Sequence, residues 1–246
     1  MTGKGRAPAD GVQRRPAVTL DALVRAGLVV LERDGLDALS MRSVAAELGV
    51  RAPSLYWHVR DKEELLDLLA DGLLGIGVPA LPPIRGDWRV ELRELAWAFR
   101  AFLNRRRDSV RVLMGRFPAG PGMAAVMEHQ LAMLDRAGFG RQDAAYITYG
   151  LSTLVTGFVY GEQRPISAAV VAGVPVREAV TAIGDTIAAF PADTYPHLVA
   201  TARELTGPHI DDRFEFVLER FLDGLAVLPR NPKPDGGGTT TAAEEG

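Results

Sequence analysis

Apolar residues recur at spacings of three and four along most of the chain, and this periodicity predicts an all-α protein. The first apolar stripe follows Thr19, whose side chain can cap a helix, and it ends near Gly35. Later stripes predict helices at residues 61–74, 88–103, 108–114, 123–134, 143–160, 176–190, 193–205 and 210–228. We expect loops at residues 115–122, which are rich in Gly and Pro, and at residues 161–175.

Residues 40–62 hold two short helical segments separated by a glycine. Ser40 can cap the first segment, and Pro53 stands in the first turn of the second, where its missing N–H costs nothing. Leu55 and Val59 are four residues apart, so they share the inward face of the second segment.

The second segment leaves aromatic side chains exposed, since Tyr56, Trp57 and His58 cannot all turn inward on so short a helix. Exposed rings on a short helix after a Gly turn are typical of a helix-turn-helix whose second helix enters the major groove of DNA. The alternative is a helical hairpin whose rings pack against a later domain. Basic residues that frame the rings and can reach phosphates favour DNA: Arg42, Arg51, Arg60 and Lys62.

The helix that follows connects this stretch to the rest of the chain. Asp61 is a side-chain acceptor at its start and Glu64 comes three residues later, which is a capping-box arrangement. Leucines cover more than one face of the helix, so we expect it to pack both on the preceding helices and on the following domain. A Pro-rich linker at residues 78–87 comes next.

Two late helices, at residues 143–160 and 210–228, are apolar over wide faces. One subunit has few partners left to cover them, which favours a helix-bundle interface between two copies of the chain. An ordinary internal bundle is the alternative, and the sequence alone does not choose between them.

Composition excludes several classes of protein. The chain has 246 residues and no Cys, so disulfides and thiolate metal sites are excluded. It contains no run of eighteen uncharged apolar residues and no apolar stretch of signal-peptide type at its start, so we expect no membrane span and a cytoplasmic location. The net charge is −3, but residues 1–60 hold nine Lys/Arg against six Asp/Glu, so this end is basic and the remainder acidic.

These patterns predict four regions. Residues 1–18 form a disordered basic arm, which either follows the phosphates of DNA or is a solubilising tail. Residues 19–64 form the helix-turn-helix DNA-binding domain, and residues 65–228 a larger helical domain whose main part, 87–228, follows the linker. Residues 229–246 form a disordered tail.

The chain resembles the TetR family of transcriptional repressors, and within it the tetracycline-repressor branch. The similarity is strongest in LSMRSVA, LGV, PSLYWHV, DK and LLD, at residues 39–45, 48–50, 53–59, 61–62 and 65–67. Leu-Tyr-Trp-His-Val is specific to that branch, and weaker similarity extends over residues 19–163. The resemblance implies an all-α homodimer with a small DNA-binding head and a larger C-terminal helical domain that dimerises and binds an inducer.

The resemblance also implies which residues contact operator DNA. Arg42 corresponds to a residue that reads a guanine edge, where a guanidinium pairs with O6 and N7. Ala52 replaces a base-reading Gln, and Met41 and Ser43 also depart from the branch pattern, so we expect a different operator. The predicted DNA-binding residues are Ser40, Met41, Arg42, Ser43, Ala52, Pro53, Ser54, Tyr56, Trp57, His58 and Lys62.

The ligand side departs further from the branch. Tetracycline repressors hold magnesium with a His where this chain has Leu113, and a polar Asn is matched by Leu95, so we predict no metal and no cofactor. A mostly apolar cavity selects a hydrophobic inducer rather than a chelated tetracycline. The predicted ligand-binding residues are Leu95, Phe99, Leu113, Arg116, Phe117, Pro118, Met127, Gln130 and Leu131.

The sequence therefore predicts a repressor that binds a palindromic operator as a homodimer and is released by a hydrophobic small molecule. Two other classes of protein remain open. One is a helical protein-interaction adaptor without DNA affinity. The other is a helical enzyme, which we do not expect because His129, His197 and His209 lie on separate elements without spaced partners.

Overall fold

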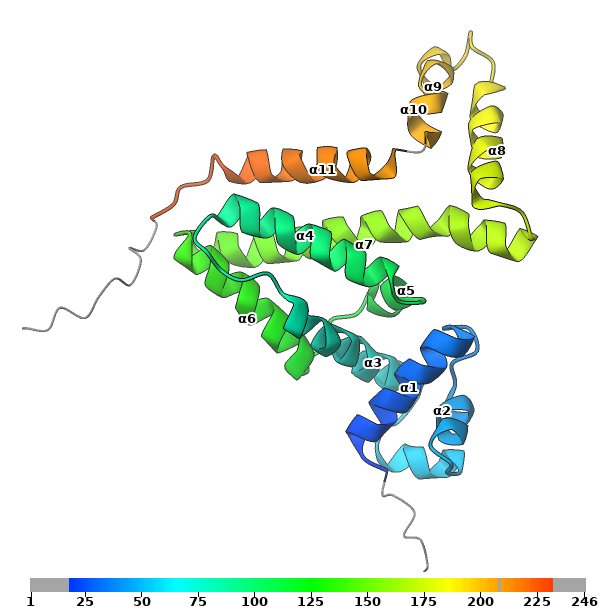
Figure 1. The fold of residues 1–246 in the computed structure, drawn as a ribbon, viewed down its shortest axis with the longest axis vertical. Helices are drawn as coiled ribbons and strands as arrows, with labels where there is room; N and C mark the ends of the chain where they lie inside the picture. Colours follow the sequence, from blue (N-terminus) through cyan, green and yellow to red (C-terminus); the bar gives the residue numbers. More distant parts are fainter. Residues whose placement is uncertain (1–17, 208, 232–246) are drawn as a thin grey trace, which may run out of the picture.

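The computed structural model describes residues 18–207 and 209–231, apart from the side chains of residues 164–172 and 176–177. The regular elements within this part of the chain are helices, and the predicted all-α architecture is confirmed (Figure 1). The α-helices are α1 (Leu20–Asp34), α2 (Met41–Glu47), α3 (Lys62–Gly77), α4 (Trp88–Asn104), α5 (Ser109–Leu113), α6 (Pro121–Arg136), α7 (Arg141–Ala172), α8 (Val176–Ala188), α9 (Pro196–Ala200), α10 (Ala202–Thr206) and α11 (Ile210–Leu225). Two 3₁₀ helices are η1 (Ala52–Trp57) and η2 (Val78–Ala80).

The head consists of α1, α2 and η1, and the predicted helix-turn-helix is confirmed. Thr19 caps α1, because its Oγ1 accepts the Ala22 N–H at 3.1 Å. Gly49 turns the chain between α2 and η1 with φ +67°, a conformation that favours glycine. The second element is one short 3₁₀ helix rather than an α-helix, and it buries Leu55 while Val59 is buried just beyond it.

Helix α3 runs from the head into the larger domain (Figure 1). Asp61 caps it by accepting the Glu64 N–H at 2.9 Å, while the Glu64 carboxylate accepts the N–H of Arg60, one residue before the position expected for a capping box. The helix is continuous across residues 64 and 65, where we expected a domain boundary. It packs on α1 on one side and on α5 and α6 on the other, so it belongs to both parts.

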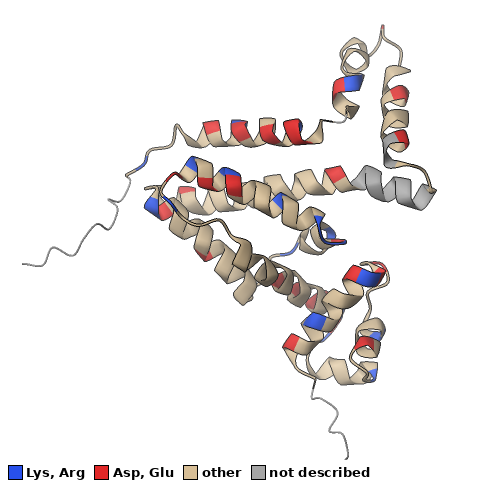
Figure 2. Cartoon of the chain, viewed as in Figure 1, with Lys and Arg blue, Asp and Glu red and all other residues tan. Residues whose placement is uncertain are grey.

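The larger domain packs α4 on α7, with α6 beside α7 and α11 along α4 (Figure 1). Phe214 of α11 is fully buried, and its ring meets those of Trp97 and Phe158 edge-on at 4.9 and 5.0 Å between centroids. Acidic residues recur along α11 (Figure 2), and Glu219 and Asp223 pair with Arg89 of α4 at 2.5 and 2.6 Å.

The loop predicted at residues 161–175 is wrong over most of its length, because α7 continues to Ala172. The start of this segment is held by α4, since Glu162 pairs with Arg100 at 3.0 Å and Gln163 donates to the Asn104 Oδ1 at 3.0 Å. These tertiary contacts outweigh the low helix propensity of Gly161.

The helix predicted at residues 193–205 is divided into α9 and α10 at Thr201. The Thr201 hydroxyl donates to the His197 carbonyl at 2.7 Å, a side-chain bond that competes with regular helical bonding. No helix in the described part of the chain is long and apolar enough to cross a membrane.

Candidate DNA-binding surface and ligand cavity

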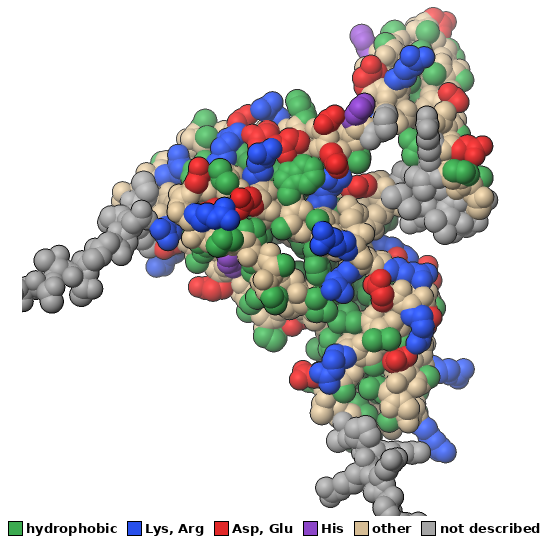
Figure 3. Space-filling model, in the orientation of Figure 1, with side chains coloured by type: hydrophobic (Ala, Val, Ile, Leu, Met, Phe, Trp, Pro, Cys, Tyr) green, Lys and Arg blue, Asp and Glu red, His purple; other side chains and the backbone are tan. Residues whose placement is uncertain are grey.

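The tip of the head presents aromatic and basic side chains. Trp57 is 89% exposed and Tyr56 55% exposed, whereas His58 is half-buried. Arg42 and Lys62 are also exposed, and Lys and Arg side chains stand out from the edge of the head in Figure 3. A Trp so exposed is not a core residue of this chain. This excludes, for the ring of Trp57, the alternative in which it packs against a later domain of the same chain.

The other predicted DNA-binding residues have different surroundings. Ser40 and Ser43 cap α2 reciprocally, since each side chain accepts the other residue's N–H, at 2.8 and 3.1 Å. Pro53 is exposed, and Ala52 and Ser54 are half-buried. Met41 departs from expectation: its side chain is buried in the head, because residues 41, 44 and 45 form the inward stripe of α2. We therefore exclude the Met41 side chain from the contact surface.

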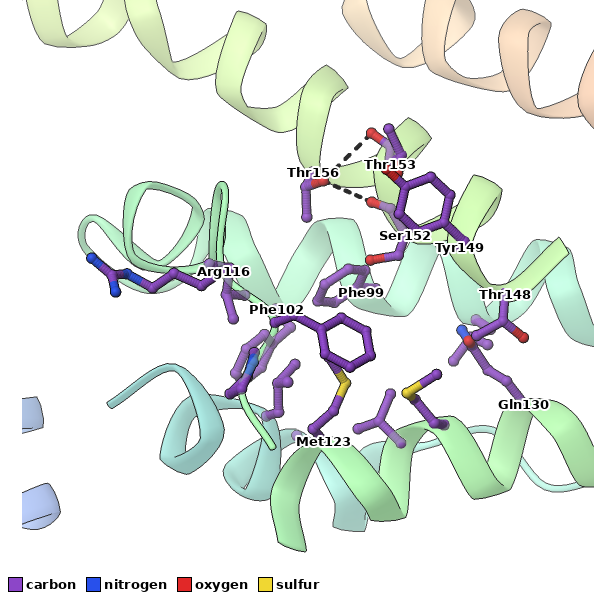
Figure 4. Close-up of a pocket in the computed structure, with 18 of the residues that line it drawn as sticks. Phe99, Phe102, Arg116, Met123, Gln130, Thr148, Tyr149, Ser152, Thr153 and Thr156 are labelled. Carbon is purple, nitrogen blue, oxygen red and sulfur yellow. Dashed lines mark hydrogen bonds between the residues drawn. The ribbon is translucent and has the colours of Figure 1, made fainter. Parts of the chain in front are cut away.

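The larger domain encloses a cavity of about 570 Å³ between α3, α4, α6 and α7 (Figure 4). Eight of the nine predicted ligand-binding residues line it: Leu95, Phe99, Leu113, Arg116, Phe117, Pro118, Met127 and Gln130. Leu131 does not. It follows Gln130 by about 100° around α6, and its half-buried side chain packs on the hydrophobic core instead.

Sequence reasoning missed the wall that α7 contributes. Polar residues follow one side of this helix and line the cavity: Thr148, Tyr149, Ser152, Thr153 and Thr156. Their spacing of three and four was a visible signal. It did not show which face of α7 turns inward. Further apolar residues that sequence reasoning missed include Leu74, Leu81, Phe102, Met114, Met123 and Val126.

Thr148 is the polar group of this wall with an unmet hydrogen bond. Its side chain is 5% exposed, and its buried hydroxyl has no hydrogen-bond partner. Gln130 lies near it at one end of the cavity and is also buried (Figure 4). A ligand oxygen or nitrogen placed there would give the Thr148 hydroxyl its missing partner and would lie beside the Gln130 amide.

Replacing Thr148 by Val is expected to raise the free energy of unfolding by about 1 kcal/mol, because it removes a buried hydroxyl without a partner. Chemical denaturation of the ligand-free protein measures this. Thr156→Val is the matched control on the same helix, since the Thr156 hydroxyl donates to the Ser152 carbonyl at 2.7 Å. If the free energy of unfolding rose equally in both variants, the gain in Thr148→Val would not come from its unpartnered hydroxyl.

Arg116 lines the cavity with its stem and turns its guanidinium away from Phe99 and Phe102 (Figure 4). The guanidinium pairs with Glu63 at 2.6 Å and Asp67 at 2.7 Å, both on α3. Partial burial disfavours the charge of Arg116, but the hydrogen bonds to these two carboxylates outweigh it and raise the Arg116 pKa. Arg116 therefore stays charged and joins the cavity to the helix that carries the head.

The residues of the cavity do not suit a magnesium-chelated ligand. Leu113, which the resemblance aligns with a metal-binding His, supplies no metal-binding atom. In the described residues no group of three or more His, Asp or Glu side chains is placed to hold a metal ion.

Two family models match the chain. Residues 23–69 match bacterial regulatory proteins of the tetR family, and residues 79–228 match the tetracyclin repressor-like C-terminal domain. The chain belongs to the TetR family. It is a DNA-binding transcriptional repressor with a helix-turn-helix head and a ligand-binding C-terminal domain.

This TetR-family repressor is similar to proteins of known name. It is 34% identical over 207 residues to the tetracycline repressor protein class A from transposon 1721 of Escherichia coli, covering 84% of this chain and 89% of that one. It is 38% identical over 144 residues to the Escherichia coli class C repressor, covering 58% of this chain and 65% of that protein. The crystal structure of Streptomyces coelicolor ActR in complex with actinorhodin is similar with a TM-score of 0.72 and 33% identity, over 86% of this chain and 96% of that one.

Proposed function

We propose that this repressor binds a palindromic operator as a homodimer and is released when an apolar small molecule enters the cavity. The observation that carries the proposal is that α3 both lines the cavity, through Leu74 and Gly77, and begins in the head. A ligand that binds better to one position of α3 shifts the heads away from the spacing that two half-sites require. By linkage, operator and ligand must then weaken each other's binding equally.

The chemistry of the cavity supports an apolar ligand with a hydrogen-bonding edge. Aromatic, aliphatic and Met side chains of α4 and α6 form one side, hydroxyl groups of α7 form the other, and Gln130 of α6 lies near Thr148 at one end. ActR, which shares this fold, binds actinorhodin. We propose an apolar molecule with an oxygen or nitrogen atom that faces Thr148 and Gln130, acting in the cytoplasm, where DNA is available.

Exposed apolar side chains support a homodimer. Tyr146 and Tyr149 of α7 are 67% and 71% exposed, and Phe216 and Val217 of α11 are also exposed. These are the two late helices that the sequence assigned to a second subunit or an internal bundle. Contact between two copies along α7 and α11 would cover them. Binding to two half-sites requires the two heads to lie about one turn of DNA, roughly 34 Å, or a nearby register apart.

Selection of bound fragments from random DNA tests the proposal directly. A palindromic site is expected, and repetition with candidate apolar ligands is expected to abolish selection with one ligand class. Binding should weaken steeply with added salt, because phosphate contacts release counterions. A helical protein-interaction adaptor would give no selected site and little salt dependence.

Arg42→Ala is expected to weaken operator binding by about 1–3 kcal/mol, roughly 5- to 150-fold, because it removes a base-reading guanidinium. Binding to random DNA should weaken much less. Fluorescence anisotropy at fixed salt measures both. Arg25→Ala, on α1 of the same head, is the matched control. If Arg42→Ala weakened binding to operator and to random DNA equally, Arg42 would contact a phosphate rather than a base.

A further inference from the structure

Three carboxylates of α3, at Glu63, Asp67 and Asp71, are spaced four residues apart, so they lie on one face of the helix. All three contact the segment of residues 116–123 that precedes and begins α6. Arg116 pairs with Glu63 and Asp67, and it also donates to the Glu63 carbonyl at 3.3 Å. Asp71 accepts the N–H of Met123 at 2.8 Å.

Asp71 caps α6 from another helix, since Gly120 at the N-cap offers no side-chain cap. The Asp71 carboxylate also accepts the Gly122 N–H at 3.2 Å. At this point the two helices approach backbone to backbone, because a Cβ added to Gly122 would lie 2.7 Å from the Gly75 nitrogen. The C-terminal half of α3 is thus fixed to α6 by close packing, while its N-terminal half meets the segment of residues 116–123 through the ion pairs of Arg116.

The same segment forms a wall of the cavity. Arg116, Phe117, Pro118 and Met123 line it, and Phe117 is 70% exposed where the cavity meets solvent. Gly115, just before the wall, has φ +73°, and nothing lies within 4 Å of a Cβ added there, so no neighbouring atom packs against the turn on that side. On that side the turn before the wall can shift without a clash.

We propose that Arg116, through its pairs with Glu63 and Asp67, transmits a displacement of this cavity wall to the N-terminal half of α3 and so to the head. The proposal deepens the regulation proposed above and rests on it. Because Glu63 and Asp67 lie within the first two turns of α3, a shift of Arg116 acts on the helix next to the head. Without Arg116 the wall moves and α3 stays in place.

A second contact holds the head to the larger domain without touching the cavity. The Asp108 carboxylate accepts the Leu36 N–H at 2.8 Å, Arg107 donates to the Arg33 carbonyl at 2.8 Å, and Arg111 pairs with Asp37 at 2.7 Å. This contact remains when Arg116 is replaced. We therefore expect an Arg116 variant to fold with its head in place and to lose the transmission.

The absence of Cys allows the cavity to be filled covalently. Ser152 lines the cavity on α7 and points toward Phe99 (Figure 4), so Ser152→Cys provides one thiol for the small aromatic label monobromobimane. The full chain with Ser152→Cys is prepared with Arg116 and with Arg116→Ala, each unlabelled and labelled, and mass spectrometry verifies complete labelling. Hydrogen exchange of the four samples is then compared over residues 40–71 and 113–127.

The label is expected to change exchange in residues 113–127 of both proteins. With Arg116 it is expected also to change exchange in residues 40–71, and with Arg116→Ala this second change should be lost. Equal changes in the head of both proteins, or no change in the head of either, would overturn the proposal. Glu63→Gln with Asp67→Asn breaks the same pairs from α3 and should reproduce the loss.

Arg93→Ala is the matched control, since Arg93 pairs with Glu219 of α11 at 3.6 Å, outside the cavity lining, and it should leave the change in the head intact. Operator binding of the same samples is measured by anisotropy. If the label changes hydrogen exchange in the head as predicted but the protein does not bind operator DNA, the proposed function is wrong and the role of Arg116 stands. If the label releases operator DNA equally from the proteins with Arg116 and with Arg116→Ala, the role of Arg116 is wrong and the proposed function stands.

Discussion

Replacing Phe214 by Ala is expected to lower the free energy of unfolding by about 3–5 kcal/mol, the cost of truncating a fully buried aromatic side chain. Its ring is 0% exposed and packs edge-on against Trp97 and Phe158. It also lies 4.9 Å from the Arg100 guanidinium, so its loss removes a cation–π contact with a buried charge.

Phe216→Ala is the matched control for this change, because Phe216 lies two residues away on α11 and is 61% exposed. Urea denaturation of both variants, at a protein concentration that keeps their association state the same, measures the difference. A loss of stability in Phe216→Ala as large as that in Phe214→Ala would show that the buried cluster is not the main stabilising contact of α11.

Replacing Gly122 by Ala is expected to cost about 3 kcal/mol, at the upper end of the range for overpacking a close contact. An added Cβ would lie 2.1 Å from the Asp71 carbonyl oxygen and 2.7 Å from the Gly75 nitrogen, and both are backbone atoms that cannot rotate away. Helices α3 and α6 must then separate, which also disturbs the cavity between them.

Gly224→Ala is the control for the gain in helix propensity, since nothing lies within 4 Å of an added Cβ there. It should be neutral or more stable by up to about 1 kcal/mol. Thermal unfolding followed by circular dichroism compares the two. If Gly122→Ala had the same melting temperature as the protein with Gly122, helices α3 and α6 would not be in close contact at this position.

The head was predictable because its determinants are local. Ser40 and Asp61 cap helices within a few residues of themselves, and Leu55 and Val59 face inward by spacing alone. The resemblance predicts Met41 in the contact surface, but its side chain is buried, as its spacing to Val44 on the inward stripe of α2 indicates.

The cavity was predictable on one side only. The resemblance indicates Phe99, Pro118 and Gln130 as lining residues. Because α7 is apolar almost all round, its sequence does not show which face meets α4 and α6 and forms the cavity wall. The continuation of α7 beyond residue 160 is supported by Arg100, which lies sixty-two positions before its partner Glu162 in the chain. No local pattern contains such a contact, so Gly161 was read as the start of a loop.

The exposure of Trp57 gives the protein an intrinsic optical probe. The chain has three Trp residues; Trp88 is buried and Trp97 is half-buried, with its indole N–H donating to Glu215 at 2.7 Å. A water-soluble collisional quencher such as iodide therefore reaches the indole in the head far more readily than the other two. The quenchable fraction of the emission reports whether the tip of the head is free or covered, without any added dye.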